Sequence, residues 1–347
     1  MDYRKAGVDI SAGNEAAKRI GKLARSTFNE RVVREVGGFG GFFSIEKLGV
    51  ENPVLVSSSD GIGTKLLVAR LAGKYDSIGE DLVNHCINDI ACCGAVPLFF
   101  MDYFAISGLK PTTAEDIISG MVKSLAKYNC PLIGGETAEM PDLYSPGDFD
   151  LAGFIVGVVN RESIIDGSAI KPGGKIIALP SNGLHTNGYT LARKVLFGMA
   201  GFEVFSRVDS IDNTVGEELL LPHICYLDAI SKVKDFARGI AHITGGGLKD
   251  NIIRILPEKC RAEMDLEGIK VPPIFDIIQR SGSIENDEMY RAFNMGVGLV
   301  IIVDDPDVDR AMGRVKEAGF NPVISGEIAS GNRDVILKGT RYCQSDG

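Results

Sequence analysis

The sequence predicts an α/β protein of two domains. Its 347 residues are more than a single average domain needs. Apolar strand-like runs alternate with segments of helical period in both halves of the chain. A polar, glycine-containing stretch from Arg161 to Gly174 separates the two series and is typical of a linker. We therefore expect an N-terminal domain at 1–165 and a C-terminal domain at 166–347, each α/β or α+β.

The N-terminal half begins with a glycine-rich segment that is only partly regular. A short helix is expected at 16–24, and the GGFGG stretch at 37–41 predicts a loop. Further along, β-branched runs predict strands, and apolar residues that recur every three or four positions predict helices. The expected strands are 53–57, 97–105, 131–135 and 151–159, and the expected helices are 78–93 and 111–128.

The C-terminal half repeats this alternation of strands and helices. Short β-branched runs bounded by glycine or proline mark its strands, and amphipathic stretches mark its helices. The expected strands are 175–180, 240–243, 296–303 and 322–328, and the expected helices are 187–198, 217–236, 248–256, 272–279 and 305–318.

Composition and charge exclude several classes of protein. Hydrophobic residues make up 45% and charged residues 24%, as in a globular protein with a large core. The net charge of −9 disfavours nucleic acid and anionic membrane as partners. No apolar run approaches the roughly 20 residues of a membrane helix, and the first ten residues lack a signal sequence, so we expect a cytoplasmic protein. The seven cysteines form no CxxC pair, which disfavours zinc.

The first chemical motif is DGIGTK at 60–65, directly after an expected strand. It matches neither a P-loop nor a dinucleotide fingerprint, because Leu66 stands where the third glycine belongs. Gly61 and Gly63 would let backbone amides approach a phosphate, and Lys65 would add a positive charge. Asp60 is a candidate magnesium ligand. The alternative is an ordinary turn with a solvated lysine.

Two more carboxylates belong to the same half of the chain. Asp89 lies within an apolar helix, where a carboxylate is costly to bury unless it is paired or bound to a metal. Glu136 follows the glycine pair that ends an expected strand. Together with Asp60 they form a candidate magnesium site of the kind that holds a nucleoside triphosphate. The alternative for Asp89 is a position on the exposed face of its helix.

The C-terminal half has two glycine-containing junctions between a strand and a helix. The first, at 182–188, contains His185, a candidate for proton transfer or phosphate contact, and Asn187, a candidate helix cap. The second, at 244–247, has three successive glycines that could form a phosphate nest or a flexible turn. The other histidines, His85, His223 and His242, are interpreted as structural.

These residues resemble a known family over almost the whole chain. Asp89, four residues and then Gly-Ala-Val-Pro match a signature shared by several ATP-dependent enzymes. Longer segments lie at 3–10, 12–14, 37–40, 59–65, 132–141, 242–247 and 293–298, and they are similar to the phosphoribosylformylglycinamidine cyclo-ligases in particular. One small departure is at 183–186, where Leu184 and Thr186 replace the proline and serine of the common Gly-Pro-His-Ser.

The resemblance implies a reaction, a fold and a set of site residues. ATP would activate the formamide oxygen of formylglycinamidine ribonucleotide as an iminophosphate, and ring closure would give aminoimidazole ribonucleotide, ADP and phosphate. The N-terminal domain would form a homodimer through its sheet. ATP and Mg²⁺ would be required, without nucleic acid or membrane. The expected catalytic residues are Asp89, His185 and Lys65; the phosphate-binding ones are Gly38, Gly40, Gly61, Gly63, Thr64, Lys65, Asn187, Gly245 and Gly246; the metal ligands are Asp60, Asp89 and Glu136.

Two alternatives remain at this point. A selenophosphate synthetase would share the signature, but typically has a reactive cysteine near its N-terminus, and residues 1–50 contain none. A non-catalytic nucleotide-binding protein would share the fold. The presence of Asp60, Lys65, Asp89 and Glu136 argues against that second alternative.

Overall fold

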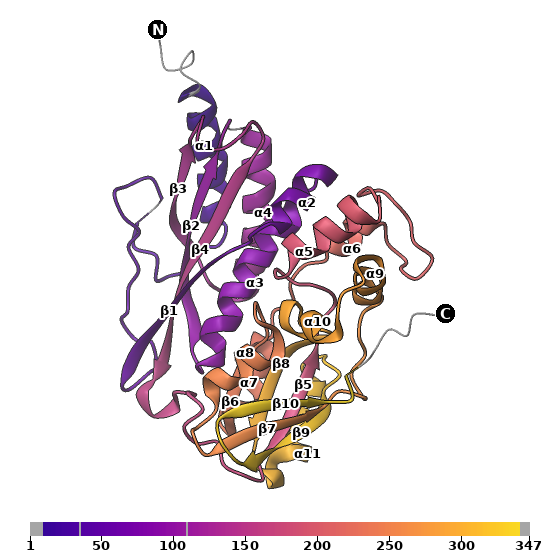
Figure 1. The fold of residues 1–347 in the computed structure, drawn as a ribbon. Helices are drawn as coiled ribbons and strands as arrows, with labels where there is room; N and C mark the ends of the chain where they lie inside the picture. The colour runs from indigo at the N-terminus through magenta and orange to yellow at the C-terminus, as the bar shows by residue number, and fades with distance from the viewer. Residues whose placement is uncertain (1–9, 35, 109, 341–347) are drawn as a thin grey trace. The chain divides into compact units, whose positions relative to one another are not determined.

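A computed structural model describes residues 10–34, 36–108 and 110–340 (Figure 1). The chain divides into two compact units. Unit 1 comprises Met1–Ile90 and Ala95–Arg161, and unit 2 comprises Ala91–Gly94 and Glu162–Gly347. The N-terminal residues 3–9, which carry part of the family resemblance, and Cys343 lie outside the described residues.

Unit 1 contains a four-stranded mixed sheet with the order β1-β4-β2-β3. β4 pairs antiparallel with β1 and with β2, and β3 is parallel to β2. One face is closely packed, since Phe100 and Phe104 of β2 are almost fully buried there, whereas the other face leaves Leu55 and Phe154 exposed. The strands are β1 (Pro53–Gly61), β2 (Val96–Ile106), β3 (Leu132–Glu139) and β4 (Phe149–Asn160).

Helices cover the buried face of this sheet. They are α1 (Ile10–Arg25), α2 (Lys65–Ala72), α3 (Asp76–Cys92) and α4 (Pro111–Lys127). Two glycines allow α3 and α4 to cross at backbone contact. A Cβ atom on Gly79 of α3 would lie 1.9 Å from the carbonyl oxygen of Ile117, and one on Gly120 of α4 would lie 1.8 Å from that of Asp76. α3 also packs closely on the sheet, since a Cβ on Gly153 of β4 would lie 2.9 Å from Cγ of Leu82.

We expect Gly79→Ala to lower the free energy of unfolding by about 3 kcal/mol, because the new methyl group forces apart two packed helix backbones. Gly313 of α11 (Val308–Glu317) is a matched control, since it is also helical and a Cβ there meets nothing within 4 Å. Gly313→Ala should raise stability by about 0.5–1 kcal/mol through helix propensity. Urea unfolding of both variants measures the difference, and equal effects would contradict the backbone contact.

Unit 2 contains a six-stranded mixed sheet with the order β10-β7-β9-β5-β8-β6. All seven residues of β8 are buried, because this strand lies inside the sheet between β5 and β6. The core of unit 2 is therefore built around β8. The strands are β5 (Lys175–Pro180), β6 (Ala237–His242), β7 (Cys260–Asp265), β8 (Val297–Val303), β9 (Val323–Ser330) and β10 (Asp334–Lys338).

The helices of unit 2 are short. They are α5 (Tyr189–Arg193), α6 (Val215–Leu219), α7 (Leu227–Val233), α8 (Gly247–Ile252), α9 (Pro273–Gly282), α10 (Asn286–Ala292) and α11, with single turns η1 (Arg161–Ser163), η3 (Ile253–Ile255) and η4 (Asp305–Asp307) and a π-helical stretch η2 (Lys194–Met199) that continues α5. The expected single helix at 217–236 is wrong. It is two helices, α6 and α7, joined by an irregular segment that contains Pro222, whose ring cannot continue a helix.

The predicted fold class is confirmed in both units. Unit 1 ends at Arg161, and the short segment Ala91–Gly94 belongs to unit 2. The domain boundary expected at 165/166 stays a prediction. The strands β7 and β10 and the helices α2 and α10 were not anticipated. β7 carries Arg261 and Glu263 on one face and buried residues on the other, so its apolar run is interrupted at every second position.

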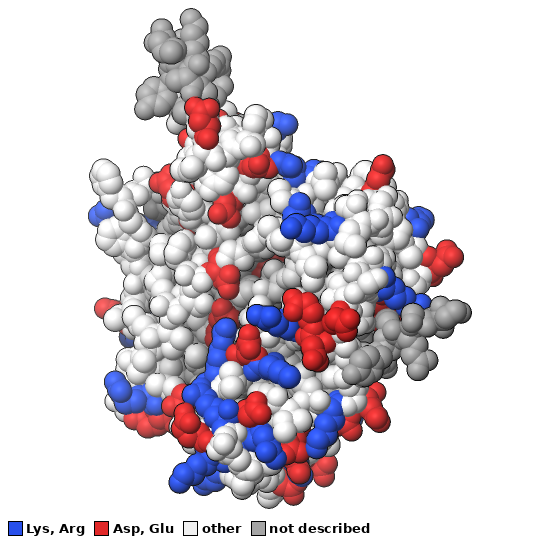
Figure 2. Space-filling view, in the orientation of Figure 1, with Lys and Arg blue, Asp and Glu red and all other residues white. Residues whose placement is uncertain are grey.

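The surface of unit 2 carries charges of both signs. On the face drawn in Figure 2, its Lys and Arg side chains alternate with Asp and Glu side chains. Interspersed charges of this kind do not create the extended positive field that a nucleic-acid backbone needs. Within the described part of the chain, no helix is both long enough and apolar enough to cross a membrane.

Candidate active-site residues in the two units

The end of β1 and the middle of α3 bring two expected metal ligands together. The Nε2 atom of His85 lies 2.8 Å from Oδ2 of Asp60 and 3.9 Å from Oδ2 of Asp89. Ser58 donates a hydrogen bond from Oγ to Oδ2 of Asp89, at 3.0 Å. His85 and Asp89 are four residues apart and so lie on one face of α3. From the sequence, His85 was interpreted as structural. Its four-residue spacing from Asp89 is the signal that could have identified it.

The electrostatics of this group follow from its burial and its charges. Burial acts to raise the pKa of Asp60, but the hydrogen bond and the charge of His85 outweigh it, so this pKa is lowered. Burial acts to lower the pKa of His85, but Asp60 and Asp89 overcome it, so this pKa is raised. The site therefore favours a carboxylate at Asp60 and an imidazolium at His85.

The Asp60 and Asp89 pair fits a magnesium ion in its donor chemistry. Both groups offer carboxylate oxygens, the ligands that Mg²⁺ prefers. Their side chains are 43% and 29% exposed, so an ion can reach them from solvent. Mg²⁺ is usually held by one or two carboxylates together with substrate phosphates and water, which agrees with a pair of this kind.

Glu136 does not belong to this pair, so the expected three-carboxylate site is wrong. Asp60, Gly153, Asp102 and Gly135 form one row across the four strands, and Glu136 follows Gly135 on β3. β1 and β3 are the two edges of the sheet, three strand spacings or about 14 Å apart. Glu136 also points to the opposite face from Asp60, because adjacent side chains alternate. One ion with bonds of about 2–2.6 Å cannot join them.

Lys65 occupies a different environment from the one expected. Its side chain is fully buried, and Nζ lies 2.8 Å from Oδ2 of Asp81, which is also fully buried. Burial lowers the pKa of Lys65 despite the charge of Asp81. A lysine enclosed with its counter-ion presents no charge at the surface, whereas the expected role in phosphate binding requires one. Thr64 precedes α2 as its N-cap residue but makes no side-chain capping bond.

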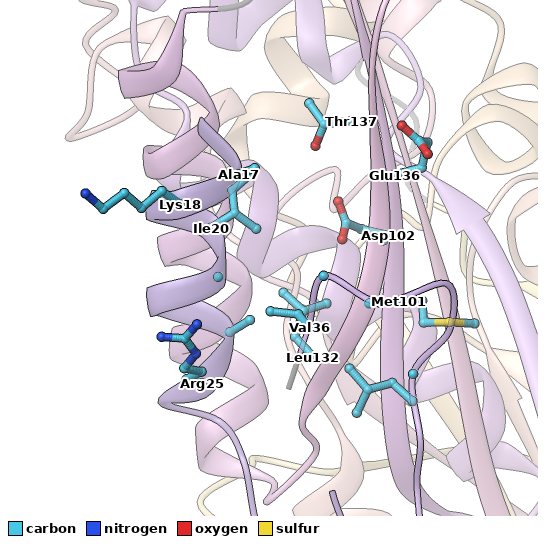
Figure 3. Close-up of a pocket in the computed structure, with 18 of the residues that line it drawn as sticks. Ala17, Lys18, Ile20, Arg25, Val36, Met101, Asp102, Leu132, Glu136 and Thr137 are labelled. Atoms are coloured by element: carbon cyan, nitrogen blue, oxygen red, sulfur yellow. The ribbon is translucent and has the colours of Figure 1, made fainter. Parts of the chain in front are cut away.

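The expected glycine loop at 37–41 lines a cavity of about 1200 Å³ in unit 1. The other walls come from α1, β2 and β3, so Gly38 and Gly40 face the same space as Glu136. Figure 3 shows Asp102 and Thr137 on the side of the strands that faces α1, with Glu136 and Met101 on the other side. Lys18 and Arg25 point from α1 away from the sheet. The cavity exceeds the 300–1,000 Å³ of a typical ligand pocket.

Asp102 is a buried carboxyl group on the wall of this cavity. Its residue is 7% exposed, and it packs so closely on Gly135 that a Cβ there would lie 2.1 Å from its Oδ1. Burial raises the pKa of Asp102 to about 7, and the charge of Glu136 adds to the effect. Asp102 therefore changes its charge near neutral pH, a property that the sequence did not indicate.

We expect Asp102→Asn to stabilise the protein above pH 7 and to change little near pH 4. The native carboxyl keeps its proton up to about pH 7, whereas the unfolded chain loses it near pH 4, so stability falls as pH rises between these values. The upper limit of the gain is about 4 kcal/mol, from 1.36 kcal/mol per pH unit. Urea unfolding at pH 5 and pH 8 measures it. Asp150→Asn, at an exposed position of β4, is the control, and a gain that does not depend on pH would contradict the assignment.

In unit 2, the loop after β5 places His185 inside the domain. His185 is 1% exposed, and its backbone has a φ of 61°, a left-handed conformation that is rare for residues other than glycine. Tyr189 donates a hydrogen bond to its carbonyl oxygen at 3.2 Å. Gly298 of β8 leaves room for the ring, since a Cβ there would lie 2.8 Å from Cε1 of His185. A direct proton-transfer role therefore requires this loop to move when substrate binds.

The second glycine junction lies beside the first. A Cβ on Gly245 would lie 3.2 Å from Oδ1 of Asn187, so the two loops meet there. Gly246 has a φ of 92° and Gly247 a φ of 64°, which only glycine adopts without strain. Asn251 donates to three carbonyl oxygens of this loop, those of Thr244, Gly245 and Gly247. The structure thus brings the expected Asn187, Gly245 and Gly246 together. Asn187 makes no capping bond to α5, whose N-cap is Gly188.

His223 and His242 complete this group. Both were interpreted as structural, although His242 begins the 242–247 segment of the family resemblance. Nε2 of His223 lies 2.8 Å from Nε2 of His242, and Nδ1 of His223 lies 3.3 Å from Oγ1 of Thr186. The His223 ring stacks on that of His185, with centroids 4.1 Å apart. Residues far apart in the sequence therefore form one histidine cluster, consisting of His185, His223 and His242.

Both halves of the chain match known protein families. The family model for the AIR synthase related protein N-terminal domain matches residues 47–159, and that for the C-terminal domain matches residues 171–338. Phosphoribosylformylglycinamidine cyclo-ligase of Trichlorobacter lovleyi is 48% identical over 94% of this chain and 95% of the relative. The protein of the same name from Thermoanaerobacter sp. is 46% identical over 97% of this chain and 100% of the relative.

Solved structures show the same fold at low identity. A thiamine-monophosphate kinase from Stenotrophomonas maltophilia matches with a TM-score of 0.70 and 16% identity, over 94% of this chain and 97% of that one. The hydrogenase maturation protein HypE of E. coli matches with a TM-score of 0.66 and 14% identity, over 95% and 98%. Both family models and the close relatives agree along nearly the whole sequence, and the chain belongs to the phosphoribosylformylglycinamidine cyclo-ligase family.

Proposed function

We propose that this chain catalyses the ATP-dependent cyclisation of formylglycinamidine ribonucleotide to 5-aminoimidazole ribonucleotide, a step of purine synthesis. The observation that carries the proposal is the 48% identity to a cyclo-ligase over 94% of the chain. A solved structure of the same fold, HypE in complex with ATP, supports ATP as the second substrate. Aminoimidazole ribonucleotide, ADP and phosphate would be released.

The chemistry requires activation of a poor leaving group. Transfer of the γ-phosphoryl group to the formamide oxygen gives an iminophosphate, and attack by the amidine nitrogen closes the ring and expels phosphate. Bound Mg²⁺ would neutralise charge on the triphosphate. Asp60 and Asp89 are the residues that would hold it, with Ser58 and His85 fixing their carboxylates. Gly61 and Gly63 follow Asp60 directly, and their backbone amides would contact phosphate oxygens, the Gly61 amide after giving up its hydrogen bond to Asp60.

The remaining residues supply orientation and proton transfer. Gly38 and Gly40 line the cavity of unit 1, whose volume is sufficient for a nucleotide. Asn187, Gly245 and Gly246 would contact phosphate groups from unit 2. His185 would serve proton transfer during ring closure after movement of its loop. Such positioning of the two reacting groups supplies a large part of the acceleration in reactions of this class.

A direct assay tests the proposal. Purified protein receives formylglycinamidine ribonucleotide, ATP and Mg²⁺, and the aminoimidazole product and ADP are measured together. One ADP per aminoimidazole is expected. Thiamine monophosphate in place of the ribonucleotide is a control, since the fold is shared with a kinase for that compound. Phosphorylation of thiamine monophosphate without cyclisation would overturn the assignment.

We also propose that two copies associate through the sheet of unit 1. Leu55 and Phe154 are 62% and 41% exposed on the face of the sheet that the helices leave open. An uncovered apolar sheet face favours association, and a symmetric dimer is the simplest solution.

We expect Leu55→Glu to convert a dimer of wild-type protein into a monomer at micromolar concentration. The introduced carboxylates would face an apolar partner surface and lose hydration there. Met199→Glu is the matched control, because Met199 is 65% exposed and belongs to unit 2. Light scattering gives the mass of each protein. A wild-type monomer, or a Leu55→Glu dimer, would contradict the interface.

A further inference from the structure

His223 occupies the centre of the histidine cluster in unit 2. It lies in the irregular segment between α6 and α7, and it is 1% exposed. One ring nitrogen reaches His242 at the end of β6, and the other reaches Thr186 in the loop after β5. Its ring face covers His185, with an angle of 23° between the planes. A single side chain thus contacts both loops that carry the candidate site residues of unit 2.

The contact between His223 and His242 couples the protonation states of the two rings. Two imidazole nitrogens 2.8 Å apart need one proton between them, since two protons would clash and none would leave two lone pairs opposed. If neutral His223 donates from Nε2, its Nδ1 accepts from the Thr186 hydroxyl. If His242 donates instead, neutral His223 carries its proton on Nδ1 and donates to Thr186. The tautomer of His242 is therefore linked to the orientation of the Thr186 hydroxyl.

The stacking contact acts on a strained part of the chain. His185 holds a left-handed backbone, which costs about 1–3 kcal/mol and persists only where the surroundings enforce it. The His185 ring is enclosed by His223 on one side and by Gly298 and Tyr226 on the other. Removal of the His223 ring would free His185 to change its rotamer and its loop conformation.

We propose that His223 is a positioning residue of the cyclisation reaction. It sets the tautomer of His242 by hydrogen bonding and the orientation of His185 by stacking, and so couples the loops 182–188 and 244–247. This inference rests on the proposed function, which places both loops at the substrate. His223 itself does not contact substrate in this role. Its effect is transmitted through Thr186, His185 and His242.

Three variants separate the contributions of the ring. His223→Phe keeps an aromatic face for His185 but loses both nitrogens. His223→Gln places an amide near the Nε2 position and so retains a partner for His242. His223→Leu removes both stacking and hydrogen bonding. We expect turnover to fall roughly 10- to 100-fold in His223→Phe, as for residues that orient another functional group. His223→Gln should recover part of it, and KM for ATP should change less than twofold.

The chain has four histidines, so ¹⁵N-histidine labelling gives a spectrum simple enough to assign by single substitutions. Wild-type protein should show a coupling across the hydrogen bond between the two Nε2 atoms of His223 and His242. In His223→Phe the His242 nitrogens should shift toward a mixture of tautomers.

The outcomes distinguish the inference from the function on which it rests. If the wild type shows no cyclisation, the proposed function fails, while the spectrum still tests the hydrogen bond. If the wild type is active and His223→Phe keeps full turnover, or the spectrum shows no shared proton, the positioning role is overturned. It is also overturned if His223→Phe and His223→Leu lose thermal stability while the folded fraction of each keeps wild-type turnover.

Discussion

Asp89→Asn is expected to lower turnover at least roughly 100-fold, or about 3 kcal/mol, while the protein remains folded. Asparagine keeps the size of the side chain and can still accept the hydrogen bond from Ser58. It removes one of the two negative charges that would hold Mg²⁺ against the triphosphate. His85 still pairs with Asp60 at 2.8 Å, so the local fold retains its main contact.

Two measurements define this result. Steady-state turnover at saturating ATP and Mg²⁺ gives the catalytic effect, and titration with Mn²⁺ followed by its paramagnetic signal gives metal affinity without turnover. Both should weaken in Asp89→Asn. Asp116→Asn is the control, since Asp116 is an exposed carboxylate on α4. Wild-type turnover with unchanged metal affinity would remove Asp89 from the metal site, and unfolding of the variant would assign it a structural role.

The sequence predicted the regular elements well where periodicity was strong. The apolar spacing through Ile78 and Cys86 located α3, and β5 begins and ends at the expected residues. It failed where one residue interrupts a pattern. Pro222 divides the expected helix at 217–236, and Arg261 breaks the apolar run of β7. In the first case a proline indicated the end of a helix, and in the second an alternation of buried and exposed residues indicated a strand. The prediction followed the longer apolar pattern instead of these local signals.

The candidate site was predictable only where its residues are near in sequence or follow adjacent elements. Asp60 and Asp89 could be grouped because each follows or precedes a glycine turn. Glu136 shares those local features, yet it lies at the other edge of the sheet, since the strand order β1-β4-β2-β3 separates β1 from β3. Strand order depends on long-range pairing that a single sequence does not specify. The same limit applies to His223, which meets Thr186 and His242 only through the tertiary fold.

Lys65→Met is expected to lower the free energy of unfolding by about 3–5 kcal/mol, the usual cost of removing one partner of a buried ion pair. Lys65 and Asp81 are both fully buried, and their charged atoms are 2.8 Å apart. Without the ammonium group, the carboxylate of Asp81 stays in an apolar interior with its countercharge removed. Lys65→Met/Asp81→Asn removes both charges and should recover a large part of the loss. A phosphate-binding lysine would behave differently, since its removal would raise KM for ATP and leave stability unchanged.

The neighbouring pair of Lys123 and Glu80 provides the matched control. Its charged atoms are 2.6 Å apart, but the Lys123 side chain is 75% exposed and the Glu80 side chain 16% exposed. A pair that reaches the surface contributes about 0–1 kcal/mol, because water still reaches the carboxylate when the lysine is removed. Urea unfolding should therefore show a large loss for Lys65→Met and a small one for Lys123→Met. Equal losses, or a Lys65→Met protein that keeps wild-type stability but binds ATP weakly, would return Lys65 to the phosphate site. If Lys65→Met greatly lowers the free energy of unfolding and Asp81→Asn restores it, Lys65 is the buried counter-ion that holds α2 against α3.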